Sequence, residues 1–340
     1  RMYNNILEKK LTELKTKNKV VIALGCSFVH GQGALDESFW NRYENISYIL
    51  GNSVSFRAPT DRLEFYKNEM LSNYPNLIET PYDHMTPNRI PINFTVMEND
   101  NSFVEVLCRE YLTDYVALNF GMRGNGNRAT VMQLFRFPEI DFSNMDDIIV
   151  LFFPSGIERF DFAQKSNNDH HTHLTVWPHW ESSNLKGTQK DLWKGYAFEC
   201  YSDYHTMYEY LDITNVLQTW CKLHKASLHI CPAFHPNITK NSFLEIINSI
   251  YTELKELLPE RQVLRRRDLK KLDAYPWEKH ILLDGCSTMS AYANKLENGI
   301  TTSGYWHYFD KGSPNKFWSR DAHPNAAVHR KVAELISELI

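Results

Sequence analysis

The chain has 340 residues, of which 43% are hydrophobic and 23% are charged. This composition is typical of a globular protein with a substantial core and excludes disordered, collagen-like and coiled-coil chains. The 37 lysines and arginines against 41 acidic residues give a net charge of −4. That balance argues against a nucleic-acid binder that works through bulk charge, so we expect no nucleic-acid partner.

Membrane and export signals are not evident. The longest apolar run, residues 148–154, is far shorter than the roughly 20 residues that cross a bilayer, so we expect no membrane partner. The amino-terminal stretch places aliphatic residues among lysines and predicts an amphipathic helix rather than an export signal. The six cysteines form no Cys-x-x-Cys pair, which favours reduced thiols over a disulfide framework or a zinc site. We therefore expect a cytoplasmic protein.

Strands and helices are expected to alternate along the chain. Short apolar runs predict strands at residues 20–24, 115–119, 148–153 and 227–231. Helical spacing predicts helices at residues 103–111, 207–225, 243–258 and 326–340. This alternation predicts an α/β fold with a parallel sheet covered on both faces.

Two stretches interrupt the alternation. Residues 51–101 contain five prolines, and residues 161–200 are rich in His, Trp, Asn and Ser. Loops this long inside a compact domain are usually lids or small inserted subdomains. We expect a single domain over residues 1–340 with insertions at about 51–101 and 161–200. The aromatic residues of the second insertion either cover a cleft and stack on a sugar ring or an acyl chain, or pack the insertion itself.

A serine follows the first predicted strand. Residues 25–31 read Gly-Cys-Ser-Phe-Val-His-Gly, which places Ser27 at the carboxyl edge of a parallel sheet, where such folds bind ligands. A serine there is a nucleophile if a base lies beside it. The spacing fits neither the Gly-x-Ser-x-Gly elbow nor a phosphate-binding P-loop. The alternative is a glycine-lined helix start with Ser27 as its cap.

Two further motifs follow later elements. Residues 119–127 read Asn-Phe-Gly-Met-Arg-Gly-Asn-Gly-Asn, a loop that can turn N–H and amide groups toward a developing anion or be only a tight turn. His323 precedes the last helix, with Asp321 two residues before it. A histidine oriented by a carboxylate supplies a general base. Taken alone, Asp321 equally suits a helix entry and His323 a surface histidine.

Together the three motifs resemble the SGNH (GDSL-like) hydrolase family over residues 19–340, apart from the two insertions. The residues that carry the resemblance are Gly25-x-Ser27-x-x-x-Gly31, Asn119-x-Gly121-x-x-Gly124 and Asp321-x-His323-Pro324-Asn325. The resemblance implies a three-layer α/β/α sandwich with a flavodoxin-like, mainly parallel, five-stranded sheet.

The resemblance also implies the roles of individual residues. Ser27 would be the nucleophile, His323 the base and Asp321 its partner, with the N–H groups of Ser27 and Gly124 in the oxyanion hole. The implied activity is hydrolysis of an ester, and a small acyl group on a carbohydrate suits the aromatic insertions. It requires no cofactor and no metal. Residues expected to line the substrate are Arg123, His30 and His235.

Two departures from the family pattern keep other functions open. The third strand runs into Phe-Pro-Ser-Gly, residues 153–156, where the family has Gly-x-Asn-Asp. The residues that remain to replace this asparagine as an oxyanion donor are Asn125, Asn127 and Ser155. The last block has Asp-x-His in place of Asp-x-x-His. The alternatives are an SGNH-like module that binds a glycan or a protein with little or no catalysis, and an acyltransferase.

Two further stretches of the sequence are rich in polar or charged residues. Residues 169–173 read Asp-His-His-Thr-His, which are metal-ligand types. Because adjacent histidines of an extended loop point in alternating directions, we expect a polar loop and no metal site. The basic stretch at residues 261–271 is expected to be a solvated face, with a patch that guides an anionic polymer as the alternative.

Overall fold

The structure is a computed structural model. It describes residues 2–32, 34–35, 37–43, 46–50, 53–80, 88–122, 124–135, 140–163, 173–176, 187–233, 238–253, 260–299, 301 and 323–340.

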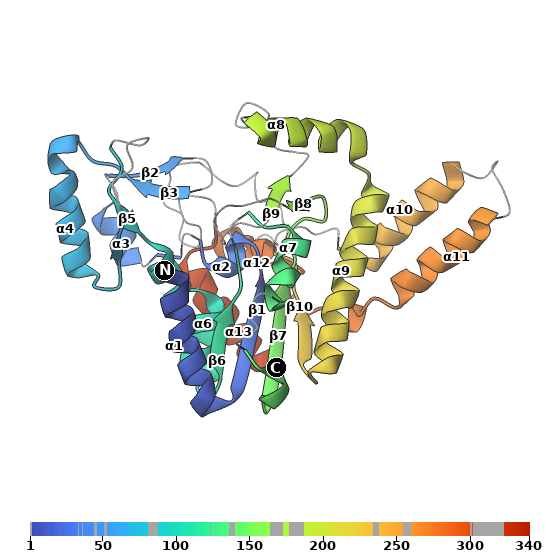
Figure 1. Cartoon of the computed structure of the whole chain (residues 1–340), viewed down its shortest axis with the longest axis horizontal. Coiled ribbons are helices and arrows are strands. Elements are labelled where there is room, and N and C mark those ends of the chain that lie inside the picture. The colour runs from blue at the N-terminus through green and yellow to red at the C-terminus, as the bar shows by residue number, and fades with distance from the viewer. Residues whose placement is uncertain are drawn as a thin grey trace.

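A four-stranded parallel sheet forms the centre of the fold (Figure 1). Its strands are β1 (Lys19–Gly25), β6 (Val116–Asn119), β7 (Asp147–Phe153) and β10 (Ser227–Ile230), in the order β10-β7-β1-β6. In the register, Ile22 of β1 lies beside Leu118 on one side and Val150 on the other. Near-continuous apolar runs are typical of strands buried on both faces. The four strands predicted from the sequence are confirmed.

The expected fifth strand is replaced, in the part of the chain that the structure describes, by a single bridge. Ile281 N donates to Ile230 O at 2.9 Å, and His280 forms a parallel bridge with Ile230. Two residues with positive φ, Asp284 (49°) and Gly285 (78°), then turn the chain back on itself. The segment therefore leaves the edge of β10 before it can form a strand.

Helices cover both faces of the sheet. Along β1, Val20, Ile22 and Leu24 face one hydrophobic cluster, while Val21 and Ala23 face another, which is the period-two alternation of a strand. The helices that contribute to the first cluster are α1 (Met2–Lys17), α7 (Asn127–Val131), α9 (Asp203–Leu223), α10 (Lys240–Glu253) and α11 (Glu260–Asp273). Those that contribute to the second are α2 (Ser27–His30), α6 (Phe103–Val106), α12 (Met289–Asn298) and α13 (Ala326–Leu339). The arrangement is consistent with a three-layer α/β/α fold.

The first insertion builds a hydrophobic cluster of its own. Around Phe39, the rings of Phe56 and Tyr74 lie at 5.3 and 4.8 Å between centroids. The cluster includes Leu35 and so begins earlier in the chain than the expected residue 51. Its elements are α3 (Glu37–Arg42), β2 (Ser47–Leu50), β3 (Ser53–Phe56), η2 (Thr60–Arg62), α4 (Leu63–Asn73), β4 (Ile78–Glu79), β5 (Ile92–Asn93) and α5 (Thr95–Asp100).

The second insertion contains an antiparallel hairpin and a helix. Its elements are β8 (Phe160–Ala163), β9 (His173–Val176), α8 (Gly187–Lys194) and the π-helical turn η7 (Gly195–Cys200). Figure 1 shows the hairpin and α8 above the end of the sheet at which α2 and α7 begin. Trp193 and Tyr196 are buried and pack with Phe160. Residues 169–172 of the histidine-rich stretch lie outside the described residues.

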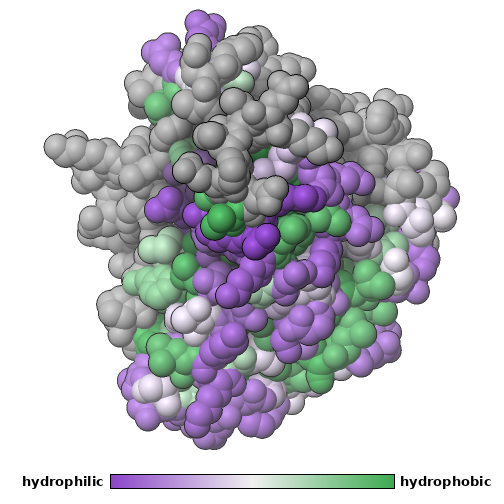
Figure 2. Space-filling model, turned by 90° about the vertical axis from the view of Figure 1, so that its right-hand side faces the viewer, coloured by the Kyte–Doolittle hydropathy of each residue, from purple (hydrophilic) through white to green (hydrophobic). Residues whose placement is uncertain are grey.

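The remaining described elements are short turns of helix: the π-helical turn η3 (Leu107–Tyr111), η4 (Met132–Phe135), η5 (Phe142–Asn144) and η8 (Trp277–Lys279). Residues 263–267 of the basic helix α11 are exposed, as expected for a solvated face. Figure 2 views the molecule from the side on which α9, α10 and α11 lie, and shows hydrophilic and hydrophobic surface interspersed there. Among the described helices, none has both the length and the hydropathy to span a membrane.

Candidate functional site

Ser27 lies where β1 turns into α2. A side chain at Gly25 would come within 2.9 Å of Phe153 O and overlap Val29, so this tight turn requires glycine. Cys26 has an extended backbone and occupies the cap position, which makes Ser27 the first residue inside the helix rather than its cap. Ser27 therefore lies in the first turn of α2, at the carboxyl edge of the sheet.

His323 meets Ser27 from the other end of the chain. Its Nε2 lies 2.8 Å from Ser27 Oγ across a separation of 296 residues. The two residues are only 5% and 7% exposed, and the Phe28 ring packs on the imidazole at 5.4 Å between centroids. Asn325 fixes the chain just beyond, because its Oδ1 accepts from Ala327 N (3.0 Å) and Val328 N (3.2 Å) at the start of α13. The arrangement can transfer the hydroxyl proton of Ser27 to His323.

The loop after β6 packs directly against α2. A side chain at Gly121 would lie 2.7 Å from the carbonyl carbon of Val29 and overlap His30 N, so only glycine permits this approach. Asn119 supports the loop, since its Oδ1 accepts from Gly121 N at 3.0 Å and its Nδ2 donates to Val29 O at 3.1 Å. The first two motifs of the sequence are therefore in contact.

His30 is buried between this loop and the first insertion. Its Nδ1 donates to Gly121 O at 3.2 Å, and its Nε2 lies 3.9 Å from Glu98 Oε2 of α5. Both ring nitrogens thus face protein groups. The substrate-lining role expected for His30 stays a prediction.

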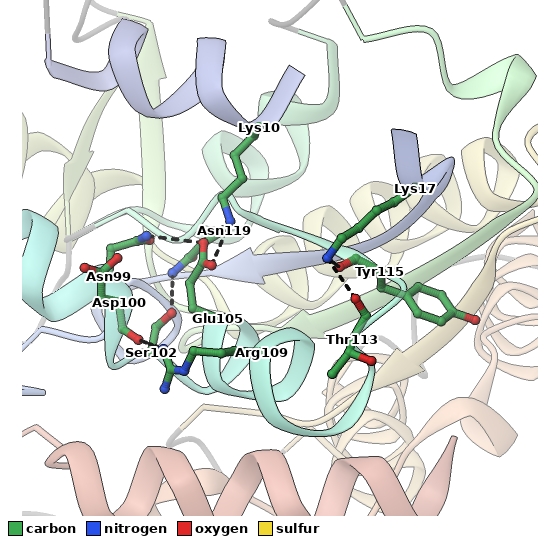
Figure 3. A network of polar contacts seen from close by, with 10 residues as sticks. All are labelled: Lys10, Lys17, Asn99, Asp100, Ser102, Glu105, Arg109, Thr113, Tyr115 and Asn119. Carbon is green, nitrogen blue, oxygen red and sulfur yellow. Dashed lines mark hydrogen bonds and ion pairs between the residues drawn. The ribbon is translucent and has the colours of Figure 1, made fainter. Parts of the chain in front are cut away.

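A polar network supports Asn119 from the side of α1 and α6 (Figure 3). Asn119 Nδ2 donates to Ser102 Oγ at 3.1 Å. Three residues farther along, Glu105 accepts from Lys10 Nζ of α1 at 2.7 Å and from Asn99 Nδ2 at 3.3 Å. Burial raises the pKa of Glu105, and the Lys10 ammonium opposes that shift. The network ties α1, α5 and α6 together beside the loop that carries Asn119.

The three residues considered as replacements for the missing oxyanion donor, Asn125, Asn127 and Ser155, do not share one environment. Asn127 and Ser155 bond to each other: Asn127 Oδ1 accepts from Ser155 N (2.8 Å) and Oγ (3.2 Å), and Asn127 Nδ2 donates to Ser155 O (3.4 Å). They join the start of α7 to the end of β7. Asn125 is half-buried and Gly124 is exposed, with a φ of 76° that favours glycine. Asp321, Arg123 and His235 lie outside the described residues.

His329, a buried histidine behind this site, was not predicted from the sequence. Its Nδ1 accepts from Phe103 N at 3.0 Å, and its ring stacks on that of Phe103. Burial, with the nearby His323 and His30, lowers the pKa of His329 to about 3, so the ring is neutral. A signal was present, because position 329 falls on the apolar stripe with Val332, Ala333 and Ile336.

Asp161 is a second residue of this region that was not predicted from the sequence. Its buried carboxylate accepts hydrogen bonds from two backbone N–H groups at the start of α7. The sequence around it carries no helix-cap signal, since the helix lies more than thirty residues earlier in the chain. Within the described residues, no group of three or more His, Cys, Asp or Glu side chains is placed to hold a metal ion.

Comparison of the chain with models of known protein families, with curated proteins and with solved structures finds no match.

Proposed function

We propose that this chain is a serine ester hydrolase of the SGNH (GDSL-like) type, with Ser27 as nucleophile and His323 as general base. The observation that carries the proposal is the 2.8 Å approach of His323 Nε2 to Ser27 Oγ. A serine becomes a nucleophile when a base within hydrogen-bond reach removes its proton. Two motifs at opposite ends of the chain meet in this geometry.

The topology of the sheet supports the SGNH-type fold. Numbered by their order in the chain, the four strands lie in the order 2-1-3-4, which is the flavodoxin-like order without its fifth strand. Ser27 follows the carboxyl end of the first strand, and the Asn-x-Gly loop follows that of the second. Ligands of such sheets bind at this edge, where the strand order reverses.

The proposed reaction begins when His323 Nε2 takes the Ser27 hydroxyl proton. Oγ bonds to the ester carbonyl carbon, and the carbonyl oxygen becomes an oxyanion that accepts from the Ser27 and Gly124 N–H groups. Collapse of this intermediate expels the alcohol, which takes the proton from His323. Water then attacks the acyl-enzyme with His323 again as base, releasing the acid and restoring Ser27. Asp321 is the proposed partner of His323, and the scheme uses no cofactor, metal or nucleic acid.

We take a small acyl ester on a carbohydrate as the substrate class. The second insertion lies over this edge of the sheet (Figure 1), and its helix α8 carries one aromatic residue, Trp193, which packs with Tyr196 and Phe160. The insertion thus places a packed aromatic cluster near the proposed site, and aromatic faces are the groups on which sugar rings stack. The same geometry also serves an acyltransferase, in which a sugar hydroxyl replaces water in the second step.

The test is hydrolysis of p-nitrophenyl acetate and of an acetylated xylooligosaccharide by the wild type and by Ser27→Ala and His323→Ala. Removing either member of such a pair should lower kcat by a factor on the order of 10⁴ to 10⁶. Ser290→Ala, at a buried serine of α12, and His224→Ala, just after α9, are matched controls that should retain wild-type kcat.

Three other outcomes separate the alternatives. Wild-type and Ser27→Ala proteins that bind the oligosaccharide equally, without turnover, would support the binding module. Product formation that requires an added sugar acceptor would support the acyltransferase. Equal hydrolysis by wild type and both variants would refute the roles of Ser27 and His323.

A further inference from the structure

We propose that Asp161 is a positioning residue for the loop that carries Gly124, and so for one side of the oxyanion hole. This inference rests on the proposed function. Asp161 belongs to β8, at the start of the second insertion, and is 5% exposed. Its Oδ1 accepts from Gly126 N at 3.0 Å, and its Oδ2 accepts from Ala129 N at 2.8 Å. One carboxylate thus holds both sides of the junction at which the loop becomes α7.

Gly126 shows how closely the carboxylate approaches the loop. A Cβ at position 126 would lie 2.7 to 2.9 Å from the carboxylate atoms of Asp161. The backbone of Gly126 is extended, with φ −82° and ψ 178°, a conformation that any residue adopts. The glycine is therefore required by the approach of Asp161 and not by the turn itself.

The Gly124 position depends on contacts on either side of it. A Cβ at Gly124 would meet nothing within 4 Å among the described atoms, so packing does not hold this residue in place. On its amino-terminal side, Met122 N donates to Gly25 O at 3.1 Å, beside Ser27. On its carboxyl-terminal side, Asn125 makes two long bonds, accepting from Arg159 Nη1 at 3.4 Å and donating to Met122 O at 3.3 Å, and the first short bond is that from Gly126 N to Asp161 at 3.0 Å. If Asp161 is lost, the segment just after Gly124 is held by the long bonds of Asn125 and by the Asn127–Ser155 pair. The Gly124 N–H can then shift relative to Ser27.

A misplaced donor costs transition-state stabilisation more than substrate binding. The oxyanion exists only during the reaction, so its donors act on kcat rather than on KM. Displacement by about 1 Å can cost on the order of 10²-fold in rate. The β8–β9 pairing, in which Asp161 lies opposite Thr175, connects this effect to the second insertion.

The experiment compares Asp161→Ala and Asp161→Asn with wild type in ester hydrolysis, with active sites titrated so that kcat refers to folded protein. We expect kcat to fall roughly tenfold to a hundredfold in Asp161→Ala with KM within about twofold. Asp161→Asn keeps one acceptor oxygen, so its kcat should fall less than that of Asp161→Ala. The matched control is Asp141→Ala, because Asp141 also caps a short helix, accepting from Ser143 N at 3.0 Å. It should retain wild-type kcat.

Amide hydrogen exchange without substrate supplies the second readout. Exchange at residues 124–131 should accelerate in Asp161→Ala, while exchange at residues 20–25 stays as in wild type. Wild-type kcat in Asp161→Ala, or unchanged exchange at residues 124–131, would overturn the assignment. A rise in KM at constant kcat would also overturn it. Absence of Ser27-dependent turnover in the wild type would instead refute the proposed function, and the catalytic part of this assignment with it, whatever the exchange shows.

Discussion

The buried His329 should make the fold sensitive to acid. The pKa of its imidazole is lowered to about 3 in the folded protein, from 6.5, because the ring is buried and lies near His323 and His30. Its Nδ1 already accepts from Phe103 N, so a second proton would break that bond. Protonation therefore favours the unfolded chain. The stability contributed by neutral His329 is complete above pH 6.5, declines as the pH falls below 6.5, and levels off below about 3.

The size of the effect follows from the two pKa values. One pKa unit corresponds to about 1.4 kcal/mol, so His329 alone should reduce the free energy of unfolding by about 2 kcal/mol between pH 7 and pH 5. His280, whose pKa burial lowers to about 4, and the carboxylates add their own pH dependence. A variant that changes only position 329 separates these contributions.

The assay is equilibrium urea unfolding of wild type and His329→Asn at pH 7, 6 and 5, followed by tryptophan fluorescence. The Asn Oδ1 can replace Nδ1 as the acceptor for Phe103 N but does not titrate. Between pH 7 and pH 5, wild type should lose about 2 kcal/mol more stability than the variant. Identical pH dependence in the two proteins would mean that His329 protonates freely in the folded state, and would refute this reasoning.

Three further substitutions test the packing around the site. Gly121→Ala places a methyl group against backbone atoms of Val29 and His30, and should lower the free energy of unfolding in urea by about 1 to 3 kcal/mol. An unchanged urea midpoint would show that the loop does not contact α2. Phe152→Ala, at a fully buried position of β7, should cost about 3 to 5 kcal/mol by the same assay, and a loss below about 1 kcal/mol would contradict its placement. Lys10→Met should lower the free energy of unfolding by about 1 to 3 kcal/mol because it leaves the Glu105 carboxylate without its charged partner. Adding Glu105→Gln should restore part of that loss, and an equal or larger loss in the double variant would contradict the pairing.

The sheet could be predicted because each of its strands is a short apolar run that can be recognised from its own residues. Residues 148–153 form an apolar run of strand length closed by a proline, and the structure has β7 there. The edge of the sheet could not be predicted in the same way. After Ile281 the chain forms no strand, because the positive φ angles at Asp284 and Gly285 turn it back so that Leu283 pairs with Cys286.

The insertions and their contacts were harder to read from the sequence. The helix at residues 260–273, outside both insertions, has four apolar residues among ten polar ones, too few for a clear hydrophobic period. In the first insertion, short elements pack through aromatic rings such as Phe39 and Phe56. Its hydrophobic residues therefore follow no regular spacing along the sequence. Asp161 caps a helix that lies far from it in sequence, and only tertiary structure creates such a cap.

The pairing of Ser27 with His323 was predictable from motif order and strand context, although neither residue identifies itself alone. Their separation of 296 residues means that only the fold brings them together. The Asn127–Ser155 pair was not foreseen as a contact, because both residues were considered only as oxyanion donors. The two residues instead link the start of α7 to the segment just after β7.

The measurement that tests the central claim most directly is labelling with a fluorophosphonate probe, followed by peptide mapping of the modified residue. The account predicts one label per chain, on Ser27, that is absent in Ser27→Ala and strongly slowed in His323→Ala, while the control variant Ser290→Ala labels like wild type. A folded wild-type protein that takes up no label, or that is labelled at a residue other than Ser27, would contradict it.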